Sequence, residues 1–318
     1  MQTRMRRPDE PASIVTSGGT FGGIEAGGTK FVCVIGDDPD TIIESTRIDV
    51  TGPAETIGAA QEFFVRAQGA GVRLEAVGVG SFGPLELRPS HPRYGFITAT
   101  PKPGWSNTDM VGPLKAALGV PVGFDTDVNA AVLAEGRWGA ARELGSYVYL
   151  TLGTGIGGGA VVDGQLVHGL GHPEMGHVAV RRRPGDGFAG VCPFHGDCFE
   201  GMASGPAVAA RFGRRAESLR GADLAAAVSL VAFYLAAGIS SLIYALAPEQ
   251  IIVGGGLATM PGLLTRARVG LTEQLHGYPG LLEHRQEAFL VPAALGAMAG
   301  PAGTLILAQR AAASRGSR

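Results

Sequence analysis

The sequence predicts an α/β protein built from two similar halves. Strand-like apolar runs alternate with stretches that have helical periodicity, which is typical of this class. A strand, a glycine turn and a second strand occur in "GGIEAGGTKFVCVIG" and again in "YVYLTLGTGIGGGAVV". The length of 318 residues also suits two ordinary domains rather than one. We therefore expect a disordered tail over residues 1–20, a first domain over 21–125 and a second over 126–293.

The first half opens with a β-hairpin in which "GGTK" joins the strands "GGIEA" and "FVCVIG". A helix is predicted near Thr56 to Gly69, and "AVGVGSFG" predicts a buried strand after it. A proline-rich loop runs from Pro84 to Gly104. A helix is then expected near Thr108 to Leu118, where Gly119 ends it.

The string "PVGFDTDVNAAVLAEGRWG" predicts a strand, an acidic turn and a helix at the junction of the halves. Its acidic residues would lie at the carboxyl end of a strand, where α/β sheets commonly bind ligands. The second half continues through the strand "IIVGGGL". A final helix near Ala294 to Arg310, within a C-terminal segment of about 294–318, is expected to cross back onto the first domain.

The segment from Leu224 to Ala247 has no charged residue and is long enough to cross a bilayer. It is nevertheless rich in alanine, is interrupted by serine and glycine, and lacks basic or tryptophan flanks. We interpret it as a helix buried within a large water-soluble protein.

Composition and charge exclude several function classes. The net charge of −2 offers no general attraction to nucleic acid, and the basic run Arg181 to Arg183 is most simply a solvated loop. Three cysteines are too few and too oddly numbered for a disulfide framework. The first twenty residues lack the apolar stretch of a signal peptide. We expect a cytoplasmic protein with no membrane or nucleic-acid partner.

The glycine loop of the second half satisfies G-x-G-x-x-G through Gly153, Gly155 and Gly158. A dinucleotide site would require a helix next, whereas the following "GAVVDGQLV" is strand-like, and no Walker A string occurs in the chain. The loop is then either a plain structural hairpin or a hairpin whose backbone N–H groups bind phosphate. Two such loops, one in each half, favour phosphate binding.

Six motifs occur in one order along the chain: "GGIEAGGTK", "FDTDVNAA", "TLGTGIGGG", "HPEMGH", "CPFHGDCFEGMASGPA" and "IIVGGGL". Over roughly Gly22 to Ala308 the sequence thereby resembles ROK-family sugar kinases, particularly their bacterial fructokinase branch. The resemblance implies an actin-like, ribonuclease H-like sugar kinase fold with a cleft between two domains. It also implies ATP-dependent phosphorylation of D-fructose to fructose 6-phosphate by a homodimer.

Phosphoryl transfer requires a carboxylate that receives the hydroxyl proton, and the resemblance assigns this role to Asp127. A carboxylate near its normal pKa would be ionised at pH 7. Aspartate at a strand-to-helix turn is also a common helix N-cap, which is the alternative for Asp127 and the simpler interpretation of Asp125.

For the sugar, the resemblance implies contacts from Thr126, Glu174, His177 and Glu200. Many glucose-directed relatives carry asparagine where this chain has Thr126, which weakens a glucose assignment. The two glutamates suit hydroxyl binding because each carboxylate accepts several hydrogen bonds, although either could be a surface acid.

For the nucleotide, the resemblance implies contacts from both hairpins and from the loop after "IIV". Mg²⁺ would travel with ATP, and Glu25 replaces an aspartate that is common in the family. The implied nucleotide-binding residues are Gly27, Gly28, Thr29, Lys30, Thr154, Gly155, Pro206, Gly254, Gly255, Gly256 and Leu257.

His177, Cys192, His195 and Cys198 offer two imidazoles and two thiolates, a set that suits tetrahedral zinc. Four protein ligands close the coordination sphere, so we expect a structural site that holds the loop carrying Glu174 and Glu200. The alternative is buried cysteines with incidental histidines. The remaining candidates His91, His168 and His172 have no comparable partners in the sequence and are interpreted as loop or surface residues.

Alternative functions come from two classes. A glucose- or mannose-directed hexokinase would differ only in a few loop residues, because these sugars differ in hydroxyl placement. A non-catalytic sugar-sensing regulator would carry a DNA-binding segment ahead of the kinase-like body, and only about twenty residues precede the first strand. A zinc-ribbon nucleic-acid module is disfavoured because basic and aromatic residues do not cluster around Cys192.

Overall fold

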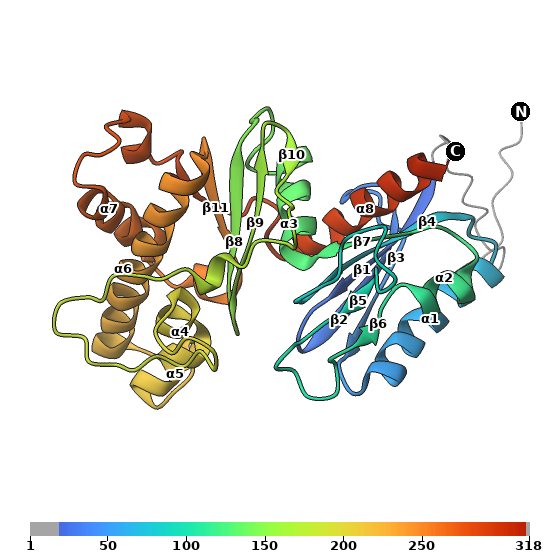
Figure 1. The fold of residues 1–318 in the computed structure, drawn as a ribbon, viewed down its shortest axis with the longest axis horizontal. Coiled ribbons are helices and arrows are strands. Elements are labelled where there is room, and N and C mark those ends of the chain that lie inside the picture. Colours follow the sequence, from blue (N-terminus) through green and yellow to red (C-terminus); the bar gives the residue numbers. More distant parts are fainter. Residues whose placement is uncertain (1–18, 316–318) are drawn as a thin grey trace, which may run out of the picture.

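The computed structural model describes residues 19–315 and places two lobes side by side, each built around a five-stranded sheet (Figure 1). The strand order is β3-β2-β1-β4-β7 in the first sheet and β10-β9-β8-β11-β12 in the second. Each sheet combines an antiparallel hairpin with parallel strands, the repeat that the sequence predicts. The expected tail lies outside the described residues except at its last two positions.

In the first lobe, helices cover both faces of the sheet. The adjacent residues Gly22 and Gly23 face Phe64 of α1 and Thr304 of α8, because successive strand residues point to opposite faces. Gly78 allows α8 to lie directly on β4, since a Cβ there would come within 1.9 Å of the Thr304 carbonyl oxygen. The elements are β1 (Thr20–Ala26), β2 (Lys30–Gly36), β3 (Glu44–Asp49), α1 (Pro53–Gly69), β4 (Leu74–Ser81), β5 (Phe96–Ile97), β6 (Thr108–Asp109), α2 (Gly112–Leu118), β7 (Val122–Thr126) and α8 (Ala299–Arg315).

In the second lobe, the large hydrophobic core lies between the sheet and helices α4 to α7. The strands are β8 (Tyr147–Leu152), β9 (Ile156–Val162), β10 (Gln165–Leu166), β11 (Gln250–Gly254) and β12 (Leu290–Pro292). The helices are α4 (Phe199–Ala203), α5 (Gly205–Phe212), α6 (Gly221–Leu246) and α7 (Leu263–Leu275), with short 3₁₀ turns η1 (Met175–His177), η2 (Ala216–Ser218), η3 (Gly256–Thr259), η4 (Leu282–Arg285) and η5 (Gly296–Met298).

Helix α3 (Asp127–Arg137) links the lobes, because it contacts β8 and β9 of the second sheet as well as α8 of the first lobe (Figure 1). Near its end, the fully buried Glu135 accepts hydrogen bonds from the backbone N–H groups of Ala140, Ala294 and Leu295. This carboxylate therefore fixes the point where the chain returns to the first lobe.

Helix α6 is the apolar segment that could by length and composition cross a membrane. Its most apolar window is 67% buried inside the structure. It packs between α4 and α7, and Tyr234 and Leu235 in its middle are completely buried. The apolar character is thus accounted for by burial in the second lobe.

Several predicted boundaries were wrong. The helix expected from Thr108 begins only at Gly112, because Thr108 and Asp109 pair with β5, although Gly119 does end it in a left-handed conformation with φ 66°. The strand expected through "AVVDGQLV" is broken at Asp163 and Gly164, both with positive φ, into β9 and β10. Helix α8 begins at Ala299, because Leu295 and Gly296 form a turn before it.

Candidate active site and metal centre

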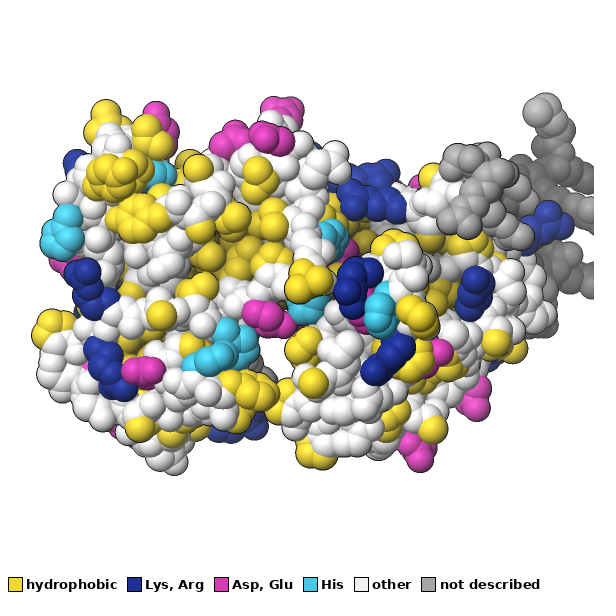
Figure 2. Space-filling model, in the orientation of Figure 1, with side chains coloured by type: hydrophobic (Ala, Val, Ile, Leu, Met, Phe, Trp, Pro, Cys, Tyr) yellow, Lys and Arg dark blue, Asp and Glu magenta, His cyan; other side chains and the backbone are white. Residues whose placement is uncertain are grey.

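A cavity of about 570 Å³ lies between the lobes, and residues of both lobes line it. Figure 2 shows the surface hollowed between the lobes, with acidic and histidine side chains beside the hollow. The cavity walls include Gly28, Thr29, Phe82, Gly83, Lys102, Thr126, Asp127, Gly153, Thr154, Gly155, His172, Glu174 and Glu200. The structure therefore brings together most of the residues that the sequence selects for sugar and phosphate.

The two glycine hairpins reach this cavity from opposite lobes. Gly28 and Thr29 belong to the turn between β1 and β2, and Thr154 and Gly155 to the turn between β8 and β9. Gly155 lets the Glu200 carboxylate approach the turn, since a Cβ there would lie 2.6 Å from its Oε2. Small residues leave the backbone N–H groups of such turns open to an anion.

Asp127 is the first residue of α3 and faces the cavity, with its Oδ1 accepting the N–H of Val128 at 2.8 Å. Burial raises its pKa to about 6, and the nearby Glu174 adds to the increase. The pKa of Asp127 is therefore higher than the normal value that we expected, although the carboxylate stays mainly ionised at pH 7. A base with a pKa close to the working pH is well matched to proton transfer.

Glu25, at the end of β1, is the second buried carboxyl group of the site. Burial raises its pKa to about 7, the charge of Asp127 raises it further, and Lys30 opposes both effects. A cation beside Glu25 would favour its ionised form against the effects of burial and of the Asp127 charge. Lys30 itself is not among the residues that line the cavity, and neither is Gly27.

Thr126, and not Asp125, caps α3: its hydroxyl oxygen accepts the N–H of Asn129 at 3.0 Å. The N-cap interpretation of Asp125 was therefore wrong. The buried Asp125 carboxylate instead accepts hydrogen bonds from Thr126 N–H and Asn129 Nδ2, and His168 Nε2 lies 3.0 Å away. This hydrogen bond to Asp125 raises the pKa of His168. His168 is an exposed loop residue, as expected, but Asp125 is a partner that the sequence did not indicate.

Glu200, in the first turn of α4, lies between the residues expected to bind the sugar and the second glycine turn. Its Oε2 accepts the N–H of Ile156, directly after the glycine turn, at 2.9 Å. Glu174 lies in the loop before η1 with a half-exposed side chain, and burial of the carboxyl group raises its pKa. Both glutamates line the cavity.

Two cavity residues escaped sequence reasoning, Lys102 and His172. The Lys102 ammonium donates to the carbonyl oxygen of Gly28 and lies 5.9 Å from the ring centres of both Phe82 and Trp105. The His172 side chain is only 6% exposed, which corrects its interpretation as a surface or loop residue without partners. His91 also has a partner, the Glu86 carboxylate at 3.4 Å. Each residue stands in a loop, so hydrophobic periodicity gave no signal for it. For His172, the available clue was its position directly before the "PEMGH" string.

The expected nucleoside residues lie beside this cavity and do not line it. Gly255 follows β11 with φ 88°, and a Cβ there would lie 2.4 Å from the Leu152 carbonyl oxygen at the end of β8. Pro206 is in the first turn of α5, whose residue Gly205 donates its N–H to Gly153 at 2.8 Å. Both segments therefore adjoin the second glycine turn.

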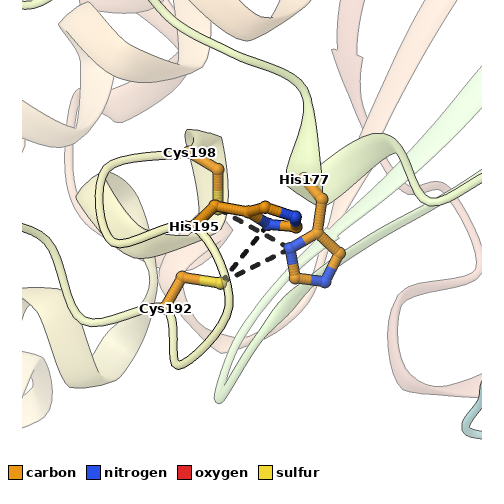
Figure 3. A group of neighbouring side chains, drawn as sticks. All are labelled: His177, Cys192, His195 and Cys198. Carbon is orange, nitrogen blue, oxygen red and sulfur yellow. Dashed lines mark hydrogen bonds between the residues drawn. The ribbon is translucent and has the colours of Figure 1, made fainter. Parts of the chain in front are cut away.

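His177, Cys192, His195 and Cys198 form one compact group that could hold a metal ion, with their ligand atoms within 4.8 Å of one another (Figure 3). His177 Nδ1 lies 3.6 Å from each of the two sulfur atoms, and His195 Nδ1 lies 3.7 Å from Cys192 Sγ. Metal–ligand bonds of about 2.0–2.3 Å give tetrahedral edges of about 3.3–3.8 Å. The donor set and its spacing thus fit a four-coordinate ion.

Local backbone contacts assemble this group. Cys192 and Gly196 exchange backbone hydrogen bonds around a tight turn, and Phe199 N–H bonds to the carbonyl oxygen of Val178. Gly190 and Gly201 approach the Gly196 carbonyl so closely that a Cβ at either would lie 1.9 Å from it. The turn is therefore held beside the extended residues that directly follow His177.

The ROK family model matches residues 21–311. The chain is 44% identical to a putative fructokinase of Bacillus subtilis over 92% of this chain and 96% of the relative. It is 43% identical to a fructokinase of Zymomonas mobilis, with 91% and 96% covered.

Solved structures agree with these matches. A ROK hexokinase from Thermus thermophilus superposes with a TM-score of 0.73 at 30% identity, covering 92% of this chain and 98% of that one. A ROK glucokinase from Streptomyces griseus, solved with glucose and AMPPNP, gives 0.71 at 25% identity, covering 92% and 100%. Since the family model spans nearly all described residues and the fold is that of ROK sugar kinases, the chain belongs to the ROK family.

Proposed function

We propose that this protein transfers the γ-phosphoryl group of ATP to D-fructose and forms fructose 6-phosphate. Relatives named fructokinase share 38–44% of their residues with this chain over most of their length. The observation that carries the mechanism is the Asp127 carboxylate, which faces a cavity bounded by a glycine hairpin from each lobe.

Asp127 is the general base in this proposal. It accepts the proton of the sugar 6-hydroxyl as that oxygen forms its bond to the γ-phosphorus and the bond to the ADP oxygen breaks. Its pKa of about 6 leaves it ionised at pH 7. The N–H of Val128 holds the carboxylate in place, so the base is oriented before the sugar arrives.

The phosphates are held by backbone N–H groups of the two hairpins, from Gly28 and Thr29 on one side and Thr154 and Gly155 on the other. Mg²⁺ bound with ATP supplies charge neutralisation at the transferred phosphoryl group. Glu25 fits a role toward that ion, because burial and then the charge of Asp127 raise the pKa of its carboxyl group, and a nearby cation would offset both effects. The nucleoside is expected beside Pro206 and the segment 254–257.

The sugar hydroxyls are held by Glu174 and Glu200, with Thr126 beside the base. His177 was also expected to contact the sugar, but it does not line the cavity, and its Nδ1 lies beside the sulfur atoms of Cys192 and Cys198. We assign zinc to the group of His177, Cys192, His195 and Cys198 on the basis of its two sulfur and two nitrogen donors. The closed set of four protein ligands gives the ion a structural role.

The test is ADP release with fructose, glucose, mannose and N-acetylglucosamine, each compared between wild type and Asp127→Asn. We expect fructose to give the highest kcat/KM and the variant to lose a factor on the order of 10²–10⁴ in kcat. No ADP release with any sugar would end the enzyme hypothesis. Normal turnover by the variant would show that the base is misassigned.

A glucose- or mannose-directed hexokinase is the second candidate, supported by the fold similarity to the Thermus hexokinase and by the Streptomyces glucokinase. The same assay separates the two. A sugar-sensing regulator would bind sugar without releasing ADP. We further propose that the protein is cytoplasmic, which fits the three free thiols in the described structure. We also propose that it is a homodimer, which sedimentation of the purified protein tests.

A further inference from the structure

His172 connects the two lobes across the front of the cavity. Its Nε2 lies 3.0 Å from the backbone nitrogen of Leu85, a residue of the first lobe 87 positions earlier in the chain. The two lobes also approach closely at Gly83, where an added Cβ would lie 3.1 Å from the Cε1 atom of His172. Phe82 and Gly83 of the first lobe and His172 of the second therefore share one wall of the cavity.

The partner atom decides the protonation state of this imidazole. A backbone N–H can only donate, so Nε2 must accept and cannot carry a proton. The remaining proton is then on Nδ1, which lies 3.4 Å from the Pro173 carbonyl oxygen and 3.6 Å from Glu174 Oε1. Burial lowers the pKa of His172, and the charge of His168 acts in the same direction. The charges of Asp125 and Asp127 oppose this decrease.

The first-lobe segment that His172 holds is itself firmly anchored. Phe82 N–H bonds to the Ala26 carbonyl oxygen, which directly precedes the first glycine turn. The Pro84 carbonyl oxygen accepts both the N–H and the hydroxyl of Thr98, and Leu85 is buried in the first-lobe core. A shift of His172 relative to Leu85 therefore requires movement of one lobe against the other.

We propose that His172 is a positioning residue that latches the lobes together at the sugar side of the cleft. Its Nε2 holds the first lobe through Leu85, while its Nδ1–H stays on the side of Glu174 and is available to a sugar hydroxyl. The latch thus sets the distance between the sugar wall of the second lobe and the first glycine hairpin. This inference rests on the proposed sugar kinase function only for its effect on turnover.

The test uses the full-length protein and the variants His172→Ala, His172→Gln and His172→Asn. The Gln side chain can bring a carbonyl oxygen to the position of Nε2, whereas Asn reaches only about as far as Nδ1. Amide hydrogen exchange at Leu85 is measured without sugar, and KM and kcat are measured with fructose. Leu170→Ala is the matched control, because Leu170 lies in the same loop and is 87% exposed.

We expect Ala and Asn to speed exchange at Leu85 roughly tenfold and to raise the KM for fructose by about the same factor, as loss of one hydrogen bond to a buried donor predicts. The kcat should change much less, and Gln should restore both exchange and KM. Unchanged exchange at Leu85 in His172→Ala overturns the latch. Identical behaviour of Gln and Asn also overturns it, and that comparison remains decisive if Ala fails to fold. Absence of ADP release by wild type would refute the proposed function and leave the exchange result standing.

Discussion

Asp127 shows how position alters the chemistry of a single carboxyl group. The residue begins α3, where Val128 N–H and the helix terminus favour the ionised form. Burial in the cleft outweighs both and raises its pKa from 3.8 to about 6. The same residue type at Asp125, two positions earlier, is instead used to hold Asn129 and His168. Aspartate therefore takes the role that its hydrogen-bond donors and its access to the cavity allow.

The pH dependence of kcat/KM follows from this pKa. Only the ionised carboxylate accepts a proton, so activity should be complete above about pH 7 and fall as the pH drops through about 6. Because the folded state raises this pKa, the ionised group opposes folding at neutral pH. Asp127→Asn should consequently unfold at a temperature equal to or above that of wild type while losing turnover. A markedly lower unfolding temperature for the variant would contradict this account of the site.

Lys102 provides a cation that sequence motifs did not indicate. Its ammonium bonds to the Gly28 carbonyl oxygen and lines the cavity, so it should steady the first hairpin and attract phosphate. We expect Lys102→Met to lower kcat/KM roughly tenfold to a hundredfold, the cost of losing one hydrogen bond from a charged group. Lys115→Met, on the exposed surface of α2, is the control and should behave as wild type. Equal activity of the two variants would remove Lys102 from the site.

At the scale of elements, the loop between η1 and α4 depends on two separate anchors. One is the group of two histidines and two cysteines. The other is Asp186, which pairs with the Arg211 guanidinium at 2.8 Å and accepts a hydrogen bond from Tyr234 of α6. The Arg211 guanidinium also lies 3.9 Å from the ring centre of Phe188. The loop is thus fixed to the core near its middle by Asp186, independently of the metal group that flanks it.

Metal removal should therefore loosen the sugar wall without unfolding the second lobe. Each chain is expected to bind one zinc ion, and a strong chelator should lower the unfolding temperature by about 5 °C or more. It should also raise the KM for fructose, because Glu200 lies two residues after Cys198 and holds the second hairpin through Ile156. Cys192→Ser should lose the ion, whereas Cys33→Ala, with its thiol buried in the first lobe, should keep it. Full metal content in Cys192→Ser would refute the assignment.

At the scale of the whole molecule, α3 and α8 are the structural link about which the lobes are arranged. Gly303 allows the two helices to touch, since a Cβ there would lie 1.8 Å from the Ala130 carbonyl oxygen. Glu135 then secures the turn that leads into α8 with two backbone hydrogen bonds, from Ala294 and Leu295. The position of Asp127 relative to the first hairpin consequently depends on contacts at the opposite end of the same helix.

Removal of the Glu135 carboxylate should destabilise the protein through this link. Glu135→Ala removes the acceptor of three part-buried backbone hydrogen bonds, at about 1–3 kcal/mol each. We expect the free energy of unfolding in urea to fall by at least about 3 kcal/mol. Glu62→Ala, on the exposed face of α1, should change it by less than about 0.5 kcal/mol. A similar small change in both variants would exclude a structural role for Glu135.

The sequence by itself determined the repeated hairpins, the family and the four metal-binding candidates, because these depend on local strings such as "GGTK" and "CPFHGDC". Hydrophobic periodicity likewise predicted α1, α3, α6, α8 and the main strands, with boundary errors where Thr108 pairs in a strand and where a turn precedes Ala299. It did not indicate α4, α5, α7, β3 or β12.

Only the tertiary structure decided the roles of isolated polar residues. Lys102, His168 and His172 stand in loops, and their partners Gly28, Asp125 and Leu85 lie 74, 43 and 87 positions away. No local pattern encodes such pairings, because they join loops that are distant in the sequence and meet only in the folded chain. The raised pKa values of Glu25 and Asp127 have the same origin, since burial between the lobes exists only after both have assembled.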